Sequence, residues 1–350
     1  MKSMLYSLDE ITLIPSSKLT NINSRSECNI YEGGKLPIFV SPMSCVIDMD
    51  NALYFENNNV NVIYPRTIPW ESRANLLRKE KWVAFGFKET QMLYHIWESD
   101  MKYGKKLDFK PHILIDQANG HMNSLYDLCK DIKDLLGDNV VLMVGNVANP
   151  DVYFKYSSIG VDYVRISVGT GGACTTSSQT GFHYPMASLL INIKEDKKFY
   201  YHDRFPKIIA DGGMMYNSQI IKALALGADY VMLGKSMAMC EESCGAMVWD
   251  MQSSSWVREY YGMSTHKAQR LIHECSGIQN DNFVEKREEG ISDYVKISYS
   301  IKDWVDWFEN DLRSAMSYAG YKKLSDFIGG VNYSYISPQT NYQIMKKIYQ

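Results

Sequence analysis

The chain has 350 residues, of which 45% are hydrophobic and 22% are charged, a composition that can bury one large core or two modest ones. Its formal net charge is -3 and it has no concentrated run of Lys and Arg, so we expect no nucleic-acid partner and no membrane surface. It has no signal-like start and no apolar stretch near the ~18 residues that span a bilayer, which predicts a cytoplasmic protein. The seven cysteines lack CxxC spacing, which excludes a zinc set or a disulfide framework.

Eight short, apolar runs rich in β-branched residues are predicted to be strands: 36–41, 60–64, 82–87, 112–116, 140–145, 162–168, 207–211 and 229–234. Helical spacing fills segments between them, as in 122–136 and in 217–227, where Gly227 fits a helix C-cap. Alternating units of this kind predict one domain over 1–350, an α/β fold of the (β/α)8 TIM-barrel type with eight parallel strands. A doubly wound open sheet is the alternative.

A barrel of this type places its chemistry just after the strands. Polar or glycine-rich residues follow seven of the eight runs: 41–43, Arg66, 116–121, 145–147, 167–183, 211–213 and 234–236. Their glycines let backbone N–H groups approach an anion closely, which predicts a phosphate site. Asp211, before two glycines, suits the hydroxyls of a ribose, although a helix N-cap would use the same residue type.

Cys174 lies in one of these strand-end segments, "SVGTGGACTTSSQTG" (167–181). A thiolate at this position can attack an electrophilic carbon of a nucleotide base while a neighbouring threonine hydroxyl relays a proton. The other six cysteines are predicted to be buried and inert.

Taken together, these segments resemble the IMP dehydrogenase/GMP reductase family. "GTGGACTTSSQTG" is similar to the family's cysteine loop, "IIADGG" to its ribose-binding strand end, "GADYVMLG" to its phosphate segment and "YYGMS" (260–264) to the segment that reaches the base. "DEITLIPS" and "NSRSEC" near the start and "DLRSAMSYAGYKKL" (311–324) also match. The resemblance therefore covers nearly the whole chain.

The resemblance is closest to the reductase branch. The connection between the second and third strands leaves no room for the regulatory domain inserted in many dehydrogenases, and "DQANGH" and "NSRSEC" are reductase-like. No Arg-Tyr dipeptide, which activates water in the dehydrogenase, occurs between Met263 and Gly290. IMP dehydrogenase remains an alternative, with Arg270 or Arg287 activating water. A relative acting on a deoxy or modified purine nucleotide is another, and the intact "CTT" argues against a non-catalytic nucleotide-binding protein.

Several residues depart from the family pattern. "SPM" (41–43) resembles the dehydrogenase version of its loop. Ser167, Thr170 and Gly172 stand where the family has glycine, proline and a phosphate-binding serine. Lys235 replaces a small residue beside the phosphate, and its side chain either contacts the phosphate or points into solvent.

The resemblance implies that NADPH, with NADH or NAD as the alternative cofactor, reduces GMP to IMP, with release of ammonia, through a covalent intermediate on Cys174. Thr176 and Glu289 match the proton-transfer pair, with Glu288 as the competing acid, in a flap of about 264–300. The implied substrate-binding residues are Ser41, Met43, Gly172, Asp211, Gly212, Gly213, Gly234, Lys235, Tyr260, Gly262, Met263 and Ser264. The implied cofactor-binding residues are Arg66, Asp116, Ala118 and Asn119, with Ser314 and Tyr318 from a neighbouring subunit. Potassium on the carbonyls of Gly169, Gly171 and Cys174, and a homotetramer, complete the expectation.

Overall fold

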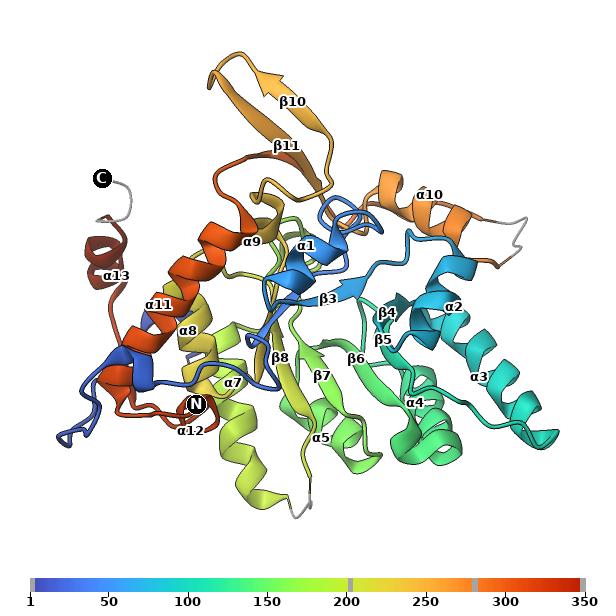
Figure 1. Ribbon diagram of the computed structural model, residues 1–350, viewed down its shortest axis with the longest axis horizontal. Coiled ribbons are helices and arrows are strands. Elements are labelled where there is room, and N and C mark those ends of the chain that lie inside the picture. The colour runs from blue at the N-terminus through green and yellow to red at the C-terminus, as the bar shows by residue number, and fades with distance from the viewer. Residues whose placement is uncertain (1–3, 201–203, 279–282, 347–350) are drawn as a thin grey trace.

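Eight parallel strands form a closed barrel in the computed structural model, which describes residues 4–200, 204–278 and 283–346 (Figure 1). In order around the barrel they are β2 (Ile38–Val40), β3 (Asn61–Tyr64), β4 (Trp82–Phe85), β5 (His112–Asp116), β6 (Val141–Val147), β7 (Tyr163–Ile166), β8 (Lys207–Asp211) and β9 (Tyr230–Leu233). Seven of the predicted runs contain one strand each, and the run 140–145 overlaps β6, which extends two residues further, to Val147. The barrel prediction is confirmed and the open sheet is excluded, because β9 pairs with β2.

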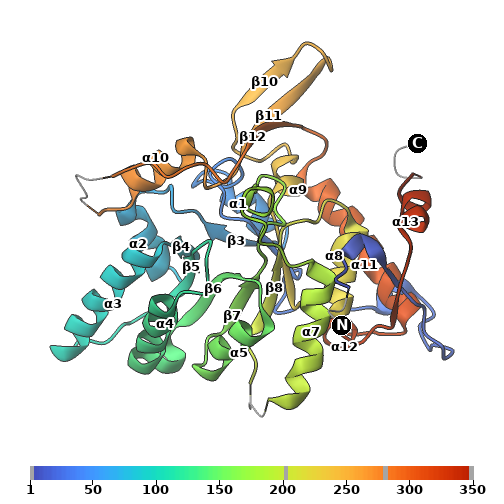
Figure 2. The same ribbon diagram turned by 180° about the vertical axis from the view of Figure 1, so that it is seen from behind.

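Helices alternate with the strands and cover the outside of the barrel (Figure 2). They are α1 (Ala52–Asn57), α2 (Trp70–Arg78), α3 (Phe87–Lys102), α4 (Asn123–Leu136), α5 (Pro150–Ser158), α7 (Met186–Asp196), α8 (Asn217–Leu226) and α11 (Ile301–Ala319). Two short helices, α6 (Thr176–Thr180) and α9 (Lys235–Ala238), lie in the segments that follow β7 and β9. The connection from β3 to β4 contains α2 alone, so it holds no inserted domain. Gly227 caps α8 with φ +122°, as its sequence position predicts.

Two layers of apolar side chains hold the barrel together. Inward-facing residues fill its interior: Phe39, Ile63, Ala84, Leu114, Met143, Ile209, Tyr230 and Met232. Outward-facing residues pack against the helices, as when Leu125, Leu128 and Ile132 of α4 bury one helical face. Because strand residues alternate between the two layers, Arg165 of β7 points inward, beside Met232.

Further elements lie outside the barrel. The antiparallel strands β10 (Met247–Asp250), β11 (Ser255–Tyr261) and β12 (Ser292–Lys296) form a sheet that projects from it (Figure 1). Helix α10 (His266–Cys275) lies between β11 and β12 in the chain, within the predicted flap. β1 (Ile11–Leu13) pairs with β13 (Tyr333–Tyr335), and the remaining elements are α12 (Leu324–Phe327), α13 (Pro338–Met345) and the 3-10 helices Leu8–Glu10, Arg25–Glu27, Gly137–Asn139 and Lys197–Phe199. None of the helices in the described part has both the length and the apolarity needed to cross a bilayer.

Candidate active site

The polar strand ends meet at one mouth of the barrel, because all eight strands run in the same direction. β7, β8, β9 and β2 are consecutive neighbours in the closed sheet. The segments that follow them carry Cys174, Asp211, Lys235 and Ser41. Four segments that are far apart in the sequence therefore border one region.

Cys174 precedes the short helix α6, and its thiol donates a hydrogen bond to the Thr176 hydroxyl over 3.3 Å. That hydroxyl donates to Oε2 of Glu289 over 2.8 Å. The three groups predicted to be catalytic are thus joined in one hydrogen-bonded chain from thiol to carboxylate. A proton can pass between thiol and carboxylate along this chain.

Backbone pairing holds the end of the flap against the cysteine loop. The N–H of Thr175 donates to the carbonyl of Glu289 over 2.9 Å, and Cys174 forms an isolated antiparallel bridge with Gly290. The pairing brings the flap backbone next to the thiol.

The same pairing distinguishes the two adjacent glutamates. Glu288 does not join the chain of hydrogen bonds from the thiol, since its Oε1 accepts the N–H of His266, the first residue of α10, over 2.7 Å. The geometry therefore brings Glu289 to the thiol and uses Glu288 to cap a helix.

Of the other six thiols, four are buried as predicted (Cys28, Cys45, Cys129 and Cys240), but the prediction is wrong for Cys244 and Cys275, which are only partly buried. Burial raises the pKa of all six thiols, to about 11 for Cys45 and about 12 for Cys244. The remaining four are Cys28, Cys129, Cys240 and Cys275. A raised pKa keeps a thiol protonated and unreactive near neutral pH, which agrees with the inert role predicted for them.

The residues expected near the base pack around Gly234, at the end of β9. A Cβ atom on Gly234 would lie 2.8 Å from Sδ of Met43, 3.3 Å from Oη of Tyr260 and 3.7 Å from Cβ of Ser41. The first of these distances leaves no room for a side chain. Glycine at this position therefore lets three segments converge.

The segment 262–264 lies on the other side of the cysteine loop. A Cβ on Gly262 would lie 2.8 Å from the carbonyl oxygen of Ala173, and Oγ of Ser264 lies 2.9 Å from the Cβ position of Gly290. Sδ of Met263 is 3.8 Å from Oγ of Ser44. The "YYGMS" segment thus contacts both the cysteine loop and the loop after β2.

The loop after β8 packs directly on the cysteine loop. Gly212 and Gly213 have φ values of +78° and +76°, a region that favours glycine. A Cβ on Gly212 would lie 3.0 Å from the backbone of Gly171, and one on Gly213 would lie 3.3 Å from the carbonyl oxygen of Thr170. Backbone therefore meets backbone at this contact, which the glycines permit because they have no Cβ.

Two departures from the family pattern are partners in space. The Ser167 hydroxyl lies 2.6 Å from the Thr170 hydroxyl, which donates to the carbonyl of Asp211 over 2.9 Å. These side chains tie the cysteine loop to the loop after β8.

The other two departures are also neighbours. The Lys235 side chain runs beside Gly172, since a Cβ on Gly172 would lie 3.4 Å from Cδ of Lys235. Lys235 is half-buried, and within the described residues its ammonium group has no hydrogen-bond or ion-pair partner. The Lys235 side chain thus extends along the glycine-rich loop, and its ammonium group is available to bind an anion.

Two of the carbonyls predicted to bind potassium already accept hydrogen bonds. The carbonyl of Gly169 accepts from the Ser177 hydroxyl over 3.2 Å, and that of Gly171 accepts from the N–H of Cys174 over 2.9 Å. Each oxygen has a second lone pair, so each carbonyl can accept a further partner beside its hydrogen bond.

Arg165 forms a buried polar network at the floor of the mouth. Its Nη2 donates to Asp116 over 2.5 Å and to Oδ1 of Asn146 over 2.6 Å. Nδ2 of Asn146 donates to Asp211 over 2.8 Å, and Nε of Arg165 lies 3.7 Å from the same carboxylate. Burial alone lowers the pKa of Arg165, but the carboxylates of Asp116 and Asp211 outweigh it and keep the guanidinium charged.

Sequence reasoning missed Arg165, and it gave no role to Asn146, which lies in the strand-end segment 145–147. The signal for the first was an arginine inside the apolar run "DYVRISV", at a position that alternation directs into the barrel. The network joins Asp116, which was expected near the cofactor, to Asp211, which was expected near the ribose.

The remaining cofactor residues are dispersed. Arg66, after β3, is 23% exposed and pairs with Glu89 over 3.1 Å. Ala118 and Asn119 are exposed after β5. Ser314 and Tyr318 lie on α11, which packs on α8 outside the barrel (Figure 2), and no hydrogen bond or ion pair of the described residues connects them to the cysteine loop.

Comparison with known proteins identifies the family. Residues 105–342 match the model of the IMP dehydrogenase / GMP reductase domain. The chain is 30% identical to a GMP reductase of Oceanobacillus iheyensis over 342 residues, which cover 94% of this chain and 95% of that protein. It is 29% identical to GMP reductases of Lactobacillus gasseri, over 91% of this chain and 92% of that protein, and of Bacillus anthracis, over 94% and 95%. The chain belongs to the IMP dehydrogenase/GMP reductase family.

Proposed function

We propose that the protein is a GMP reductase, which converts GMP to IMP and ammonia with NADPH as reductant. The observation that carries the proposal is the chain of hydrogen bonds from Cys174 through Thr176 to Glu289. It supplies both a nucleophile and a route for the proton that ammonia needs in order to leave. The similarity to GMP reductases over more than nine-tenths of the chain supports the same reaction.

In this mechanism the Cys174 thiolate adds to C2 of the purine, and the C2–N bond to the amino group then breaks. Glu289 delivers a proton through the Thr176 hydroxyl to the departing nitrogen, which leaves as ammonia, and a thioimidate remains on the cysteine. The cofactor, when bound, supplies hydride to C2. The C–S bond then breaks, so GMP, NADPH and two protons give IMP, NADP⁺ and ammonium.

The substrate in this proposal is a purine nucleoside 5′-monophosphate. The glycines at 172, 212, 213 and 234 would let backbone N–H groups reach its phosphate. Asp211 would accept from the ribose hydroxyls, and the purine would lie between the loop after β2 and the 260–264 segment. Because Asp211 already accepts from Asn146 through Oδ2, its other oxygen remains for the sugar. A deoxynucleotide lacks the 2′-hydroxyl, so this oxygen of Asp211 would have one hydrogen-bond donor fewer than with a ribonucleotide.

We further propose that Lys235 contacts the phosphate, rather than pointing into solvent. Its stem lies along Gly172, and its ammonium group has no partner among the described residues. A dianionic phosphate between the two loops would supply that partner. The lysine would then take over the phosphate contact that the family assigns to the serine at the Gly172 position.

The cofactor site in this proposal begins at the end of β5. Asp116, Ala118 and Asn119 form a polar, accessible edge suited to a nicotinamide amide, and Arg66 offers a cation for the cofactor phosphates. Ser314 and Tyr318 would complete the site from a neighbouring subunit, which their place outside the barrel allows, and a homotetramer would bring them there. Potassium on the carbonyls of Gly169, Gly171 and Cys174 would hold the cysteine loop.

An IMP dehydrogenase would need a group that activates water at the same thiol. One candidate, Arg270, is paired with Glu285 within the flap, and the other, Arg287, is exposed. The pairing of Arg270 favours reduction over hydrolysis.

The test mixes purified protein with GMP and NADPH and follows both loss of the nicotinamide absorbance and release of ammonia. We expect both signals from the wild type and from Cys129→Ala, a control that removes a buried thiol on α4. We expect neither from Cys174→Ala. NADH formation from IMP and NAD⁺ would instead identify a dehydrogenase, and turnover of dGMP in preference to GMP would reassign the sugar. Absence of turnover with all of these substrates would contradict the proposal.

A further inference from the structure

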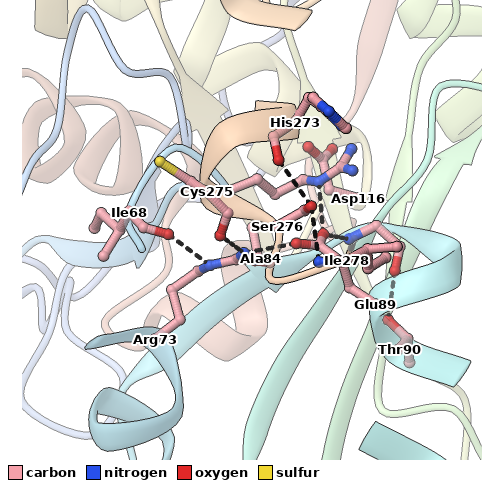
Figure 3. Close-up of polar contacts among 12 residues, drawn as sticks. Ile68, Arg73, Ala84, Glu89, Thr90, Asp116, His273, Cys275, Ser276 and Ile278 are labelled. Atoms are coloured by element: carbon pink, nitrogen blue, oxygen red, sulfur yellow. Dashed lines mark hydrogen bonds and ion pairs between the residues drawn. The ribbon is translucent and has the colours of Figure 1, made fainter. Parts of the chain in front are cut away.

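Arg73, on α2, is fully buried and every part of its guanidinium has a partner (Figure 3). Nε donates to the carbonyl of Ile68 over 2.8 Å, and Nη1 donates to that of Ala84 over 3.2 Å. Nη2 donates to Oε1 of Glu89 over 2.6 Å and to the carbonyl of Cys275 over 2.9 Å. Three of these acceptors belong to the barrel and its first helices, but the fourth belongs to the end of α10.

Other contacts at the same place hold the end of α10 on α2. The Cys275 thiol donates to the carbonyl of Thr67 over 3.0 Å. Gly277 has φ +70°, and a Cβ there would lie 2.8 Å from Cγ of Trp70. The indole ring of Trp70 also lies beside the Arg73 cation, 5.7 Å from Cζ. The residues 275–277 thus fit closely against α2.

The other end of α10 reaches the candidate catalytic residues. Its first residue, His266, donates its N–H to the carboxylate of Glu288, next to Glu289. The ten residues of α10 span about 15 Å. One rigid helix therefore runs from the Arg73 contact to the segment that presents Glu289 to Thr176.

We propose that Arg73 is a positioning residue, which docks the distal end of the flap on the barrel and thereby keeps Glu289 at the Thr176 hydroxyl. Glu89 orients the guanidinium from the barrel side, and the carbonyl of Cys275 is the point at which the flap is held. The catalytic consequence rests on the proposed function, whereas the docking itself does not.

The test uses two variants that weaken the contact from opposite sides. Arg73→Met removes the donors, and Gly277→Ala introduces a Cβ against Trp70. The matched controls are Arg78→Met, an exposed arginine on the same helix, and Gly104→Ala, a glycine with φ +78° and open space around its Cβ position. Full-length protein is used throughout.

Hydrogen exchange of the α10 amides is the first measurement. We expect it to rise by roughly tenfold or more in both test variants and to stay at the wild-type level in both controls, because loss of docking lowers local stability. Unchanged protection of α10 in either folded test variant would overturn the proposal. If Arg73→Met fails to fold, the Gly277→Ala measurement decides.

Kinetics form the second measurement. We expect kcat to fall by roughly tenfold or more with a smaller change in KM for GMP, because misplacing a catalytic group by about an ångström costs up to about a hundredfold in rate. Arg73→Lys should recover part of kcat, since an ammonium group reaches fewer of the acceptors. Undocked α10 with a wild-type kcat would overturn the positioning role. If the wild type is inactive on GMP, only the proposed function fails, and docking can still be tested by the rate at which Cys174 is alkylated. A faster rate in the test variants than in the wild type would support docking. An unchanged rate would contradict docking.

Discussion

The two halves of the barrel mouth are built by different means. Around β7, β8 and β9, glycine-rich loops pack backbone against backbone, and Gly212 and Gly213 occupy positive φ values. Around β3 and β4, ion pairs of side chains hold the elements together instead, as when the partly exposed Arg66 and the buried Arg73 share the carboxylate of Glu89. The glycine-rich loops after β7, β8 and β9 can therefore approach an anion closely, whereas the ion pairs around β3 and β4 fix the distance between elements.

The comparison explains which parts of the site the sequence reveals. A glycine that must accept a positive φ or a close backbone neighbour leaves a local signature, such as "GTGGACTT" or "DGG". A buried ion pair between residues 16 positions apart, such as Arg73 and Glu89, leaves none, because each residue alone reads as an ordinary charged residue on a helix surface. The four predictions below test each half, beginning with the largest expected effect.

Glu289→Gln tests the cysteine half. The amide cannot supply the proton that the carboxyl group passes through Thr176, so we expect kcat to fall by about 10²–10⁴-fold. Glu288→Gln is the matched control and should retain most of the activity, since Glu288 caps α10. Steady-state kinetics with GMP measure both. Equal losses in the two variants would mean that the assignment of the adjacent glutamates is wrong.

Arg165→Met tests the floor between the two halves. Its removal leaves the half-buried carboxylates of Asp116 and Asp211, which are 17% and 20% exposed, together without a cation. Breaking a fully buried pair costs about 3–5 kcal/mol, so with this partial exposure we expect a loss near the lower end of that range. The free energy of unfolding in urea should fall accordingly, whereas Arg78→Met should change it by less than about 0.5 kcal/mol. A stability near that of the wild type would show that water, not Arg165, compensates these carboxylates.

Lys235→Met tests whether the glycine half needs a cation. Loss of a hydrogen bond to a charged phosphate costs about 1.5–3 kcal/mol, so we expect GMP to bind roughly ten- to a hundredfold more weakly. The affinity for guanosine, which lacks the phosphate, should not change, and Lys302→Met on α11 is the control. Calorimetry on the wild type and the two variants, each with GMP and with guanosine, provides the affinities. Equal weakening for GMP and guanosine would contradict a phosphate contact.

The smallest expected effect is a difference in labelling rate between the Cys174 thiol and the other thiols of the chain. At pH 8 the six other thiols stay protonated, because burial raises their pKa values, to about 11 for Cys45 and about 12 for Cys244. A thiolate-selective reagent should therefore modify one cysteine per chain rapidly, identified as Cys174 by peptide mapping. Labelling of the others should grow only as the pH approaches their raised pKa values. Rapid labelling of Cys129 at pH 8 would instead indicate that α4 opens.

The sequence predicted the barrel well, because eight apolar runs, each followed by a helical pattern, leave few alternatives. Local chemistry on the glycine-rich loops was also predictable, and the structure brings Cys174, Thr176 and Glu289 together. The separation of Glu288 from Glu289 was not predictable, since it depends on one backbone hydrogen bond from Thr175. The β10–β11–β12 sheet was missed. β10 and β12 are short and mostly exposed, and β11, although seven residues long and partly buried, lacks a regular apolar alternation.

Glu89 has a consequence for how ligands and the flap influence each other. Its two carboxylate oxygens bind two arginines, one partly exposed near the proposed cofactor site and one that holds α10. An anion that draws Arg66 away leaves Glu89 to Arg73 alone and so alters the free energy of docking. By thermodynamic linkage the docked flap must then change the affinity for that anion by the same factor. Anion binding at Arg66 and docking of α10 at Arg73 are thus thermodynamically coupled through the carboxylate of Glu89.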